Sequence, residues 1–346
     1  MEVAGPAAAA LNTLTPAQIQ FLESVPKAEL HAHLNGSIPL PTLQELASEY
    51  LASSSGEGAI SNETIKQGID VLSKGPKLDE IHDFFGLFPA IYALTSTPAA
   101  LARATRAVLS AFLDRQPPQC NHLELRTTPK HTDAMDREGY LRTVLAELDR
   151  YEPDQVGLIV SLDRKMGEEV IKEIVDIACA LRKEGKRVIG LDLCGDPMAG
   201  DMTKLEPYFA QVKNAGLGLT LHIAETVHNT PEETLQLLSY SPNRLGHATF
   251  LNDEAISIVL EKKMCIEICL TSNLLCKTVS TLEVHHIGQY LKADHPIAIC
   301  SDDILPFKTS LVAEYALLLA KPPYGLGLTE EQVRRIGEMS LDARFR

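Results

Sequence analysis

Three stretches in the middle of the chain read VGLIVSLD (156–163), VIGLDLCG (188–195) and LGLTLHIAE (217–225). Each is a run of apolar and β-branched residues that predicts a buried strand, and each precedes a segment whose apolar residues have helical spacing. The stretches begin 32 and 29 residues apart, close to the ~30 residues of one strand-helix-strand unit. Unbroken apolar strands that alternate with helices indicate a parallel sheet covered on both faces.

The same rhythm extends toward both ends of the chain. Five further predicted strands are ELHAHL (29–34), HLELRT (122–127), RLGHA (244–248), CIEICLTSN (265–273) and PIAICSDD (296–303). From the second strand onward, successive strands begin 34, 32, 29, 27, 21 and 31 residues apart. Eight such units predict an α/β fold of the (β/α)₈ TIM-barrel type. A doubly wound open sheet is the alternative, but neither GxGxxG nor GxxxxGK[ST] occurs in this sequence.

The interval between the first and second predicted strands is much longer than the others. It has to hold extra helices, which we place at 40–51, 78–93 and 98–114, with a Ser/Gly-rich turn at 53–58. The expected architecture is therefore a TIM barrel with extra helices inserted after the first strand. We expect one domain over 26–346, preceded by an N-terminal tail and lead-in over 1–25, in which the first 15 or so residues form a loose tail.

Charge and cysteine usage limit the compartment and the partners. The chain has 346 residues, with 46 Asp plus Glu against 32 Lys plus Arg and a formal net charge of −14. Binding to a nucleic-acid polymer rests on Lys and Arg displacing counterions, so no such partner is expected. Seven scattered cysteines without a CxxC pair indicate a reduced, intracellular chain. With no basic leader and no long apolar run, we expect a cytoplasmic (cytosolic) protein without a membrane partner. We expect a monomer, although the sequence leaves the oligomeric state open.

Uncommon polar residues gather where the predicted strands end. His31 and His33 lie two residues apart in the first strand, so their side chains share one face. The others are His222, Glu225, His247, Asp302 and Asp303. In a barrel these strand ends meet at one mouth, where barrel enzymes keep their chemistry. Three imidazoles and a carboxylate suit Zn²⁺, which accepts nitrogen and oxygen ligands and keeps a position for water in catalytic sites.

Six motifs in order resemble the adenosine/AMP deaminase family of zinc hydrolases. They are LHAHLNGS (30–37), GLDLCGDP (190–197), LHIAE (221–225), RLGHA (244–248), LTSN (270–273) and SDD (301–303). A lone HxH would be a weak signal, whereas six motifs in this order are specific. The resemblance implies one zinc ion per subunit, held by His31, His33, His222 and Asp302, with His33 and His222 also facing the substrate.

The resemblance also implies catalytic roles. Glu225 would donate a proton to the purine ring, and His247 would orient and stabilise a zinc-activated hydroxide. Asp303 would hydrogen-bond both the hydroxide and the base, and the backbone of Gly195 would contact the purine. These roles agree with the chemistry: attack at the C6 carbon dearomatises the ring, so a ring nitrogen must gain a proton as the bond forms.

Asn35 bears on whether the substrate is a nucleotide. It stands two residues after the second histidine of HAH, where adenosine deaminases usually have an aspartate that meets a 5′-hydroxyl. A carboxylate there would repel a phosphate, whereas an amide can donate to it. The loop RTTPK (126–130) offers a phosphate seat without competing carboxylates. Its expected substrate contacts are Thr127, Thr128, Pro129 and Lys130.

LNGS after HAH, together with RTTPK, resembles the adenosine deaminase-like subgroup, which acts on N6-methyl-AMP. By that resemblance Asp163 also faces the substrate, and Tyr92 stands near a position where the subgroup usually has a histidine contact. The sequence thus predicts hydrolytic deamination of a 6-aminopurine nucleotide, N6-methyl-AMP to IMP and methylamine, by a zinc-activated hydroxide. One alternative is an adenosine deaminase acting on the free nucleoside; another is a catalytically inactive purine-binding or signalling protein.

The adjacent His285 and His286 are expected on a polar helix face.

Overall fold

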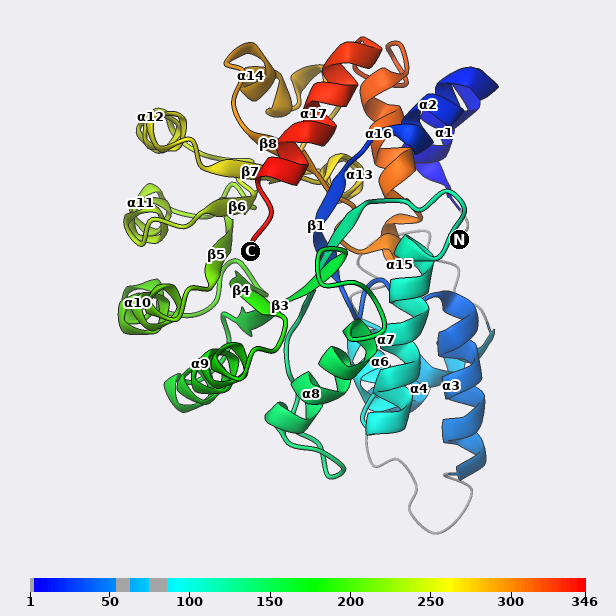
Figure 1. Ribbon diagram of the computed structural model, residues 1–346, viewed down its shortest axis with the longest axis vertical. Helices are drawn as coiled ribbons and strands as arrows, with labels where there is room; N and C mark the ends of the chain where they lie inside the picture. The colour runs from blue at the N-terminus through cyan, green and yellow to red at the C-terminus, as the bar shows by residue number, and fades with distance from the viewer. Residues whose placement is uncertain (1–2, 54–62, 75–85) are drawn as a thin grey trace.

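The sheet confirms the predicted barrel. The computed structural model describes residues 3–53, 63–74 and 86–346. Its strands are β1 (Ala28–His33), β2 (His122–Thr127), β3 (Val156–Asp163), β4 (Val188–Cys194), β5 (Gly218–Ile223), β6 (Arg244–His247), β7 (Cys265–Ile268) and β8 (Ile297–Ile299). They form one sheet in chain order, each strand parallel to the next. All eight predicted strands are found, and the fold is a (β/α)₈ barrel surrounded by helices (Figure 1).

Asp302, which follows β8, closes the barrel. Its backbone forms a parallel bridge with Ala32 of β1. The Asp302 N–H donates to the His31 carbonyl at 2.9 Å, and the His33 N–H donates to the Asp302 carbonyl at 3.1 Å. The residue that joins the last strand to the first is thus one of the predicted metal ligands.

Helices cover the outside of the barrel. After β2 these are α8 (Arg137–Leu148), α9 (Glu168–Lys183), η1 (Met202–Lys204), α10 (Glu206–Asn214), α11 (Pro231–Ser239), α12 (Asp253–Lys262), α13 (Leu270–Leu275), η2 (Leu282–Val284), α14 (Ile287–Lys292), α15 (Ile304–Phe307), α16 (Leu311–Leu319) and α17 (Glu330–Asp342). Side chains of Asp136, Thr230 and Asn252 cap three of them by accepting a backbone N–H of the first turn. None of the described helices has both the length and the apolar character needed to span a membrane.

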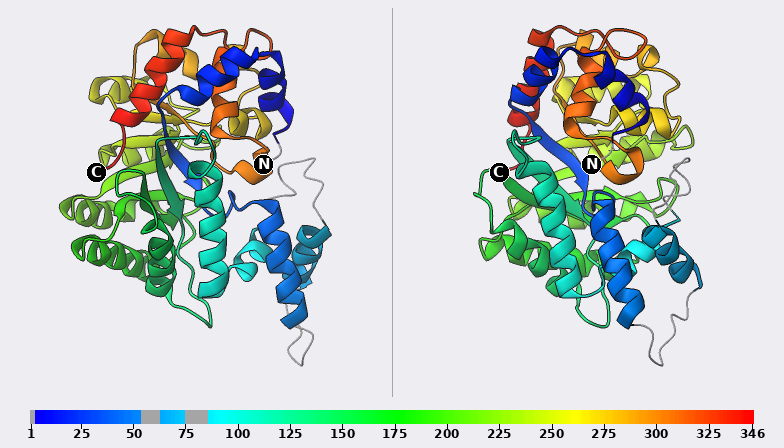
Figure 2. Two further views of the ribbon diagram at one scale, coloured as in Figure 1. Left: turned by 45° about the vertical axis from the view of Figure 1, so that its right-hand side comes forward. Right: turned by 90° about the vertical axis from the view of Figure 1, so that its right-hand side faces the viewer.

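The inserted helices lie together beside the barrel (Figures 1 and 2). They are α3 (Leu40–Ser53), α4 (Glu63–Lys74), α6 (Phe88–Leu94) and α7 (Pro98–Leu113). The helices predicted at 40–51 and 98–114 are confirmed. The prediction missed α4. Of the helix predicted at 78–93, only 86–93 falls on described residues, and 88–93 lies within α6. The predicted turn at 53–58 lies almost entirely outside the described residues.

The expectation of a loose N-terminal tail is wrong. Residues near the N-terminus form α1 (Gly5–Thr13) and α2 (Pro16–Ser24), and α1 packs against α16 (Figure 2). Ala7 and Ala10 are fully buried there. Short alanine side chains allow close helix packing but add little hydrophobic periodicity, so the sequence pattern did not indicate this contact. The division of the chain at residue 25 stays a prediction.

Phe345 covers the amino-terminal end of the barrel. Its ring packs against Gly190 of β4 and Gly218 of β5, where an added Cβ would lie 2.6 Å and 2.4 Å from ring atoms. The Arg244 guanidinium stacks on the ring at 3.6 Å from its centroid. The Phe345 N–H donates to Glu124 Oε1 at 2.6 Å. The two glycines therefore leave the space that the Phe345 ring needs to cover this end of the barrel.

The Gly218→Ala change is expected to destabilise the protein by about 1–3 kcal/mol, because the new methyl group displaces the Phe345 ring. Urea unfolding measures this loss. In a Phe345→Ala background the same change should cost less than about 0.5 kcal/mol, since the clash is gone. Gly288→Ala, in the open space of α14, is the control and should not destabilise. Equal costs in both backgrounds would contradict the proposed contact.

Candidate active site

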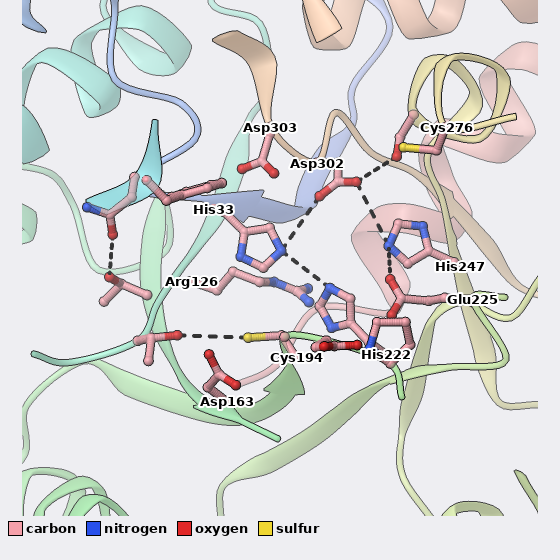
Figure 3. A pocket seen from close by; sticks show the side chains of 18 of the residues that line it. His33, Arg126, Asp163, Cys194, His222, Glu225, His247, Cys276, Asp302 and Asp303 are labelled. Atoms are coloured by element: carbon pink, nitrogen blue, oxygen red, sulfur yellow. Dashed lines mark hydrogen bonds and ion pairs between the residues drawn. The ribbon is translucent and has the colours of Figure 1, made fainter. Parts of the chain in front are cut away.

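A cavity of about 790 Å³ opens at the carboxyl ends of the strands (Figure 3). Most predicted site residues line it. They are His33, Asn35, Tyr92, Thr127, Thr128, Asp163, Gly195, His222, Glu225, His247, Asp302 and Asp303. His31 is fully buried, at the margin of this cavity. Residues from β1, β2, β3, β5 and β6 and from segments that follow the strands thus converge on one space.

The predicted metal ligands come together. His33 Nε2 lies 3.3 Å from His222 Nε2. Asp302 Oδ1 lies 3.6 Å from His31 Nε2 and 3.6 Å from His33 Nε2. The other carboxylate oxygen, Asp302 Oδ2, accepts from Ser272 Oγ at 2.8 Å, which fixes the direction of the group.

Two residues outside the predicted ligand set also reach this point. Ligand atoms of His31, His222 and His247 lie within 4.8 Å of one another, and those of His31, Cys269 and Asp302 form a second such group. His247 was predicted to have a catalytic role instead, and no metal role was expected of Cys269. The cluster therefore offers more donors than a four-coordinate ion requires.

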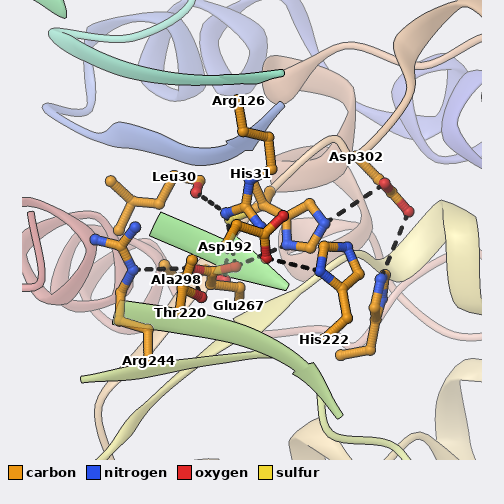
Figure 4. Close-up of polar contacts among 12 residues, drawn as sticks. Leu30, His31, Arg126, Asp192, Thr220, His222, Arg244, Glu267, Ala298 and Asp302 are labelled. Atoms are coloured by element: carbon orange, nitrogen blue, oxygen red, sulfur yellow. Dashed lines mark hydrogen bonds and ion pairs between the residues drawn. The ribbon is translucent and has the colours of Figure 1, made fainter. Parts of the chain in front are cut away.

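Glu267 fixes the orientation of His31 (Figure 4). Its carboxylate receives His31 Nδ1 at 2.7 Å, Arg126 Nη2 at 2.8 Å, Thr220 Oγ1 at 2.8 Å and Arg244 Nε at 2.7 Å. The carboxylate accepts, so the His31 proton is on Nδ1 and the other ring nitrogen is free. Burial and the positive charge of Arg126 hold the pKa of His31 well below its usual range. The ring is thus a neutral ligand candidate.

Asp192 fixes the orientation of His222, as Glu267 does for His31. Its Oδ1 lies 2.9 Å from His222 Nδ1, and its Oδ2 accepts from Ser161 Oγ at 3.0 Å. Burial acts to raise the pKa of Asp192, but the charges of His222 and Arg126 lower it to about 2. Burial acts to lower the pKa of His222, yet Asp192 raises it to about 9. The charged His222 ring carries a proton on both nitrogens, and a metal ion bound at Nε2 would displace the proton there.

This arrangement fits a divalent transition metal. In His31 and His222 the outer ring nitrogen is held by a carboxylate and the inner nitrogen faces the common point, as in carboxylate-histidine-metal triads. His31 Nε2 is buried without a hydrogen-bond partner in the part of the chain that the structure describes. Buried polar atoms rarely remain unpaired unless a ligand or water satisfies them, so the donor set is suited to an ion.

The predicted catalytic side chains face the same space. His247 Nε2 lies 3.3 Å from Glu225 Oε1 and 3.9 Å from Asp302 Oδ2. Burial and the neighbouring Asp302 raise the pKa of Asp303 well above its usual range. A Cβ on Gly36 would lie 1.6 Å from Asp303 Oδ1, so the glycine of LHAHLNGS makes room for this carboxyl. The sequence analysis did not assign Gly36 that role.

Asn35 presents an unsatisfied donor. Its Oδ1 lies 3.5 Å from Thr127 Oγ1 and 3.4 Å from Tyr140 OH, and these two hydroxyls are 2.9 Å apart. Its Nδ2 is buried and has no hydrogen-bond partner among the described residues. The amide oxygen is held by hydroxyls, so the amide nitrogen is the group left without an acceptor in a residue that lines the cavity.

Two predicted substrate contacts do not line the cavity. Pro129 is buried, and Lys130 Nζ lies 4.3 Å from the centroid of the Tyr92 ring. Burial lowers the pKa of Lys130, although the charge of Asp163 opposes this. An unpredicted cation, Lys165, lines the cavity instead. Its position depends on the loop after β3, which the sequence pattern does not determine.

Gly195 lies where the prediction requires a glycine. Its φ of +97° is outside the range that other residues readily adopt. An added Cβ would also lie 2.5 Å from Asp163 Oδ1. The backbone of Gly195 and the carboxylate of Asp163 therefore form one close-packed part of the cavity wall.

The expectation of a polar helix face at His285 and His286 is wrong. His285 is only 4% exposed, and both residues precede α14 instead of lying within it. Their rings stack with centroids 4.4 Å apart, and His286 Nε2 lies 2.9 Å from the His247 carbonyl oxygen. The argument from helical geometry did not apply, because the two residues are not part of a helix.

The partners that orient the imidazoles were also missed. Arg126, Asp192 and Glu267 are charged residues inside β2, β4 and β7, and each is fully buried. The side chains of a strand alternate between its two faces. Charged residues on the inward face, which also carries His31 and His222, would have indicated an ionic barrel interior. That period-two signal was present in the sequence.

Comparison with known proteins identifies the family of the chain. The family model described as adenosine deaminase matches residues 26–345. The chain belongs to the adenosine deaminase family. It is 33% identical over 355 residues to the N6-mAMP deaminase of Arabidopsis thaliana, covering 94% of each chain, and 33% identical over 344 residues to the human N6-methyl-AMP deaminase, covering 95% of this chain and 91% of the human one. The crystal structure of Arabidopsis ADAL complexed with IMP is similar with a TM-score of 0.80, 32% identity and 94% coverage of each chain.

Glu267→Gln is expected to weaken divalent-metal binding by about 10- to 100-fold, because it removes the negative acceptor that holds His31. Competition with a chromophoric chelator measures the affinity. Glu314→Gln is the matched control: Glu314 is equally buried, but its carboxylate accepts from Thr309 Oγ1 and Thr271 N. Thermal unfolding of both variants reports any general loss of stability. Equal weakening by both changes would contradict a specific role of Glu267.

Proposed function

We propose that this member of the adenosine deaminase family hydrolyses N6-methyl-AMP to IMP and methylamine in a zinc-dependent reaction. Relatives that bear the name N6-methyl-AMP deaminase match almost the full length of the chain. A similar structure is complexed with IMP, which is the product of the proposed reaction. The observation that favours a nucleotide is the buried, unsatisfied Nδ2 of Asn35.

An amide donor at this position suits a 5′-phosphate. The Asn35 side chain is held by two hydroxyls through its oxygen, and its nitrogen is left without an acceptor. A buried donor without a partner is costly, and a phosphate oxygen would satisfy it. Aspartate, which nucleoside deaminases usually have here, would repel that oxygen. The proposal also includes Thr127, Thr128, Pro129 and Lys130 as the phosphate seat.

The proposed zinc ion, one per subunit, would be held by His31, His33, His222 and Asp302. When bound, zinc supplies a Lewis acid that lowers the pKa of a water ligand to about 7. The chain prepares the site for it by fixing the outer nitrogens of His31 and His222 on Glu267 and Asp192. The Asp302 carboxylate is held by Ser272.

Glu225, His247 and Asp303 would carry the proton movements. Glu225 donates to the N1 nitrogen of the purine while the attacking oxygen bonds to C6, since the ring otherwise gains an unstable negative charge. His247, 3.3 Å from Glu225, orients the attacking water, and Asp303 hydrogen-bonds both that water and the base. Over the whole reaction, one water proton ends on N1 of the product ring and the other on the leaving methylamine.

The cavity wall would select the substrate. The backbone of Gly195 approaches the purine, and Asp163 and Tyr92 contact the substrate beside it, with His33 and His222 at the reacting end.

We further propose a cytosolic monomer; the scattered free cysteines support a reducing compartment.

A free nucleoside is the second candidate substrate. Lys130 packs over the Tyr92 ring and does not line the cavity, and the Thr127 hydroxyl already contacts Tyr140. Both observations leave the phosphate seat less complete than the sequence suggests. Direct assays separate the two candidates.

A side-by-side turnover assay with N6-methyl-AMP, AMP and adenosine tests the proposed function. We expect kcat/KM for N6-methyl-AMP to exceed that for adenosine by at least about 100-fold, because a polar phosphate seat is left unpaired by the nucleoside. Treatment with a chelator should abolish turnover and zinc should restore it. The Glu225→Gln variant controls for contaminating activity. Adenosine turnover at a similar rate would contradict the nucleotide proposal, and no turnover of any substrate would favour an inactive binding protein.

Lys130→Ala tests the phosphate seat. It should lower kcat/KM for N6-methyl-AMP by about 10- to 100-fold, the value of a charge-assisted hydrogen bond, and leave adenosine turnover nearly unchanged. Lys165→Ala is the control: Lys165 also lies at the cavity, but it is exposed and 3.1 Å from Asp196, so its loss should matter less. Equal losses with nucleotide and nucleoside would exclude a phosphate role for Lys130.

A further inference from the structure

The backbone at His247 has an unusual conformation. His247 and Ala248 have φ values of +59° and +50°, in the left-handed region that residues other than glycine seldom adopt. Such conformations persist only where surrounding contacts hold them, and they concentrate at functional sites. The His247 side chain depends on this backbone for its direction toward Glu225.

His286 provides a contact that holds this backbone. Its Nε2 lies 2.9 Å from the His247 carbonyl oxygen. A carbonyl can only accept, so the His286 proton is on Nε2, and Nδ1 is buried without a partner among the described residues. Burial lowers the pKa of His286 to about 4, so the ring remains neutral and keeps this single donor.

His285 in turn holds the His286 ring. The two rings stack with centroids 4.4 Å apart and planes 19° from parallel. Both nitrogens of His285 are engaged: Nδ1 accepts from the Ile287 N–H at 3.1 Å, and Nε2 lies 3.1 Å from Asn273 Oδ1. The Asn273 Nδ2 is fixed by Thr278 Oγ1 at 3.0 Å. The donor of His286 is thus placed by a chain of oriented groups.

We propose that His286 is a positioning residue for deamination, which holds His247 in its left-handed conformation through the Nε2 hydrogen bond to the His247 carbonyl. This inference rests on the proposed function. His286 is not among the residues that line the cavity, so it acts through His247. The hydrogen bond directs His247 Nε2 to within 3.3 Å of Glu225 Oε1 and 3.9 Å of Asp302 Oδ2.

The His286→Phe variant tests this role, because phenylalanine keeps a flat ring for the stack on His285 but cannot donate. We expect kcat for N6-methyl-AMP to fall by about 10- to 100-fold, as for other small misplacements of a catalytic group, with KM close to the wild-type value. His286→Gln offers an N–H donor at a similar reach and should restore most of the rate. A change in KM without a fall in kcat, or no change in either constant, would overturn the proposal.

His295→Phe is the matched control. His295 is also buried, its Nε2 lies 2.7 Å from the Met264 carbonyl, and its ring packs near Tyr290. Met264 and His295 precede β7 and β8, at the end of the barrel opposite the site. The change therefore removes an equivalent hydrogen bond without contacting His247, and kcat should remain near wild type. An equal fall in kcat would show a general loss of stability and overturn the positioning role.

A double-mutant cycle with His247→Ala identifies the path of the effect. If His286 acts through the His247 side chain, His286→Phe should change kcat less than about twofold when that side chain is absent, since effects along one path are not additive. Multiplicative losses would mean that His286 acts elsewhere and would overturn the proposal.

Crystal structures of the wild-type and His286→Phe proteins test the same inference without turnover. The wild type should show the hydrogen bond between His286 and His247, and the variant should show His247 moved away from Glu225. An unchanged His247 in the variant would overturn the positioning role, even if the wild type deaminated N6-methyl-AMP. Conversely, a wild type that fails to turn over this substrate, but loses the His247 geometry on substitution, would refute the proposed substrate and not the contact.

Discussion

The carboxylate of Glu267, surrounded by four donors inside the barrel, is the interaction on which the site depends. Many barrels fill this space with layers of branched apolar side chains, whereas this one holds a network of alternating charges. Glu124 pairs with Arg244, Arg244 with Glu267, Glu267 with Arg126, and Arg126 lies 3.4 Å from Asp192. Removal of one partner from such a network leaves a buried charge uncompensated, which is strongly destabilising. The imidazoles of His31 and His222, the candidate metal ligands, gain their fixed orientation from this mutual dependence.

The two faces of the strands have different roles: the outward face packs against the helices, and the inward face carries the polar groups. Outward residues such as Leu158, Val160 and Leu191 are fully buried against the surrounding helices, and this apolar layer contributes most of the stability. Inward residues carry the charges and the candidate ligands. At the mouth, the left-handed residues His247 and Asp302 line the cavity. The rigid outer layer is what allows such disfavoured conformations to persist.

The sequence was most informative where two signals coincided. Strands β1, β5, β6 and β8 combined a strand pattern with polar residues in the strand or at its end, so both the barrel and the convergence of His31, His222 and Asp302 could be predicted. Where one signal was weak, prediction failed: α1 is formed by small alanines, and His285 precedes the helix on which it was expected to lie. The position of Lys130 depends on loop conformation, which residue type does not determine. Glu267 and Asp192 could have been found, because their charges interrupt apolar strands in register with the histidines.

The Phe345 ring has a consequence for the dielectric environment of the interior charges. The ring centroid lies 3.6 Å from the Arg244 guanidinium, which is only 1% exposed and pairs with Glu124 and Glu267. An apolar ring in this position excludes water, and in the resulting low dielectric each of these charge pairs interacts more strongly than it would in water. The packing of one aromatic side chain at the amino-terminal end of the barrel thus strengthens the electrostatic interactions that orient the imidazoles near its carboxyl end.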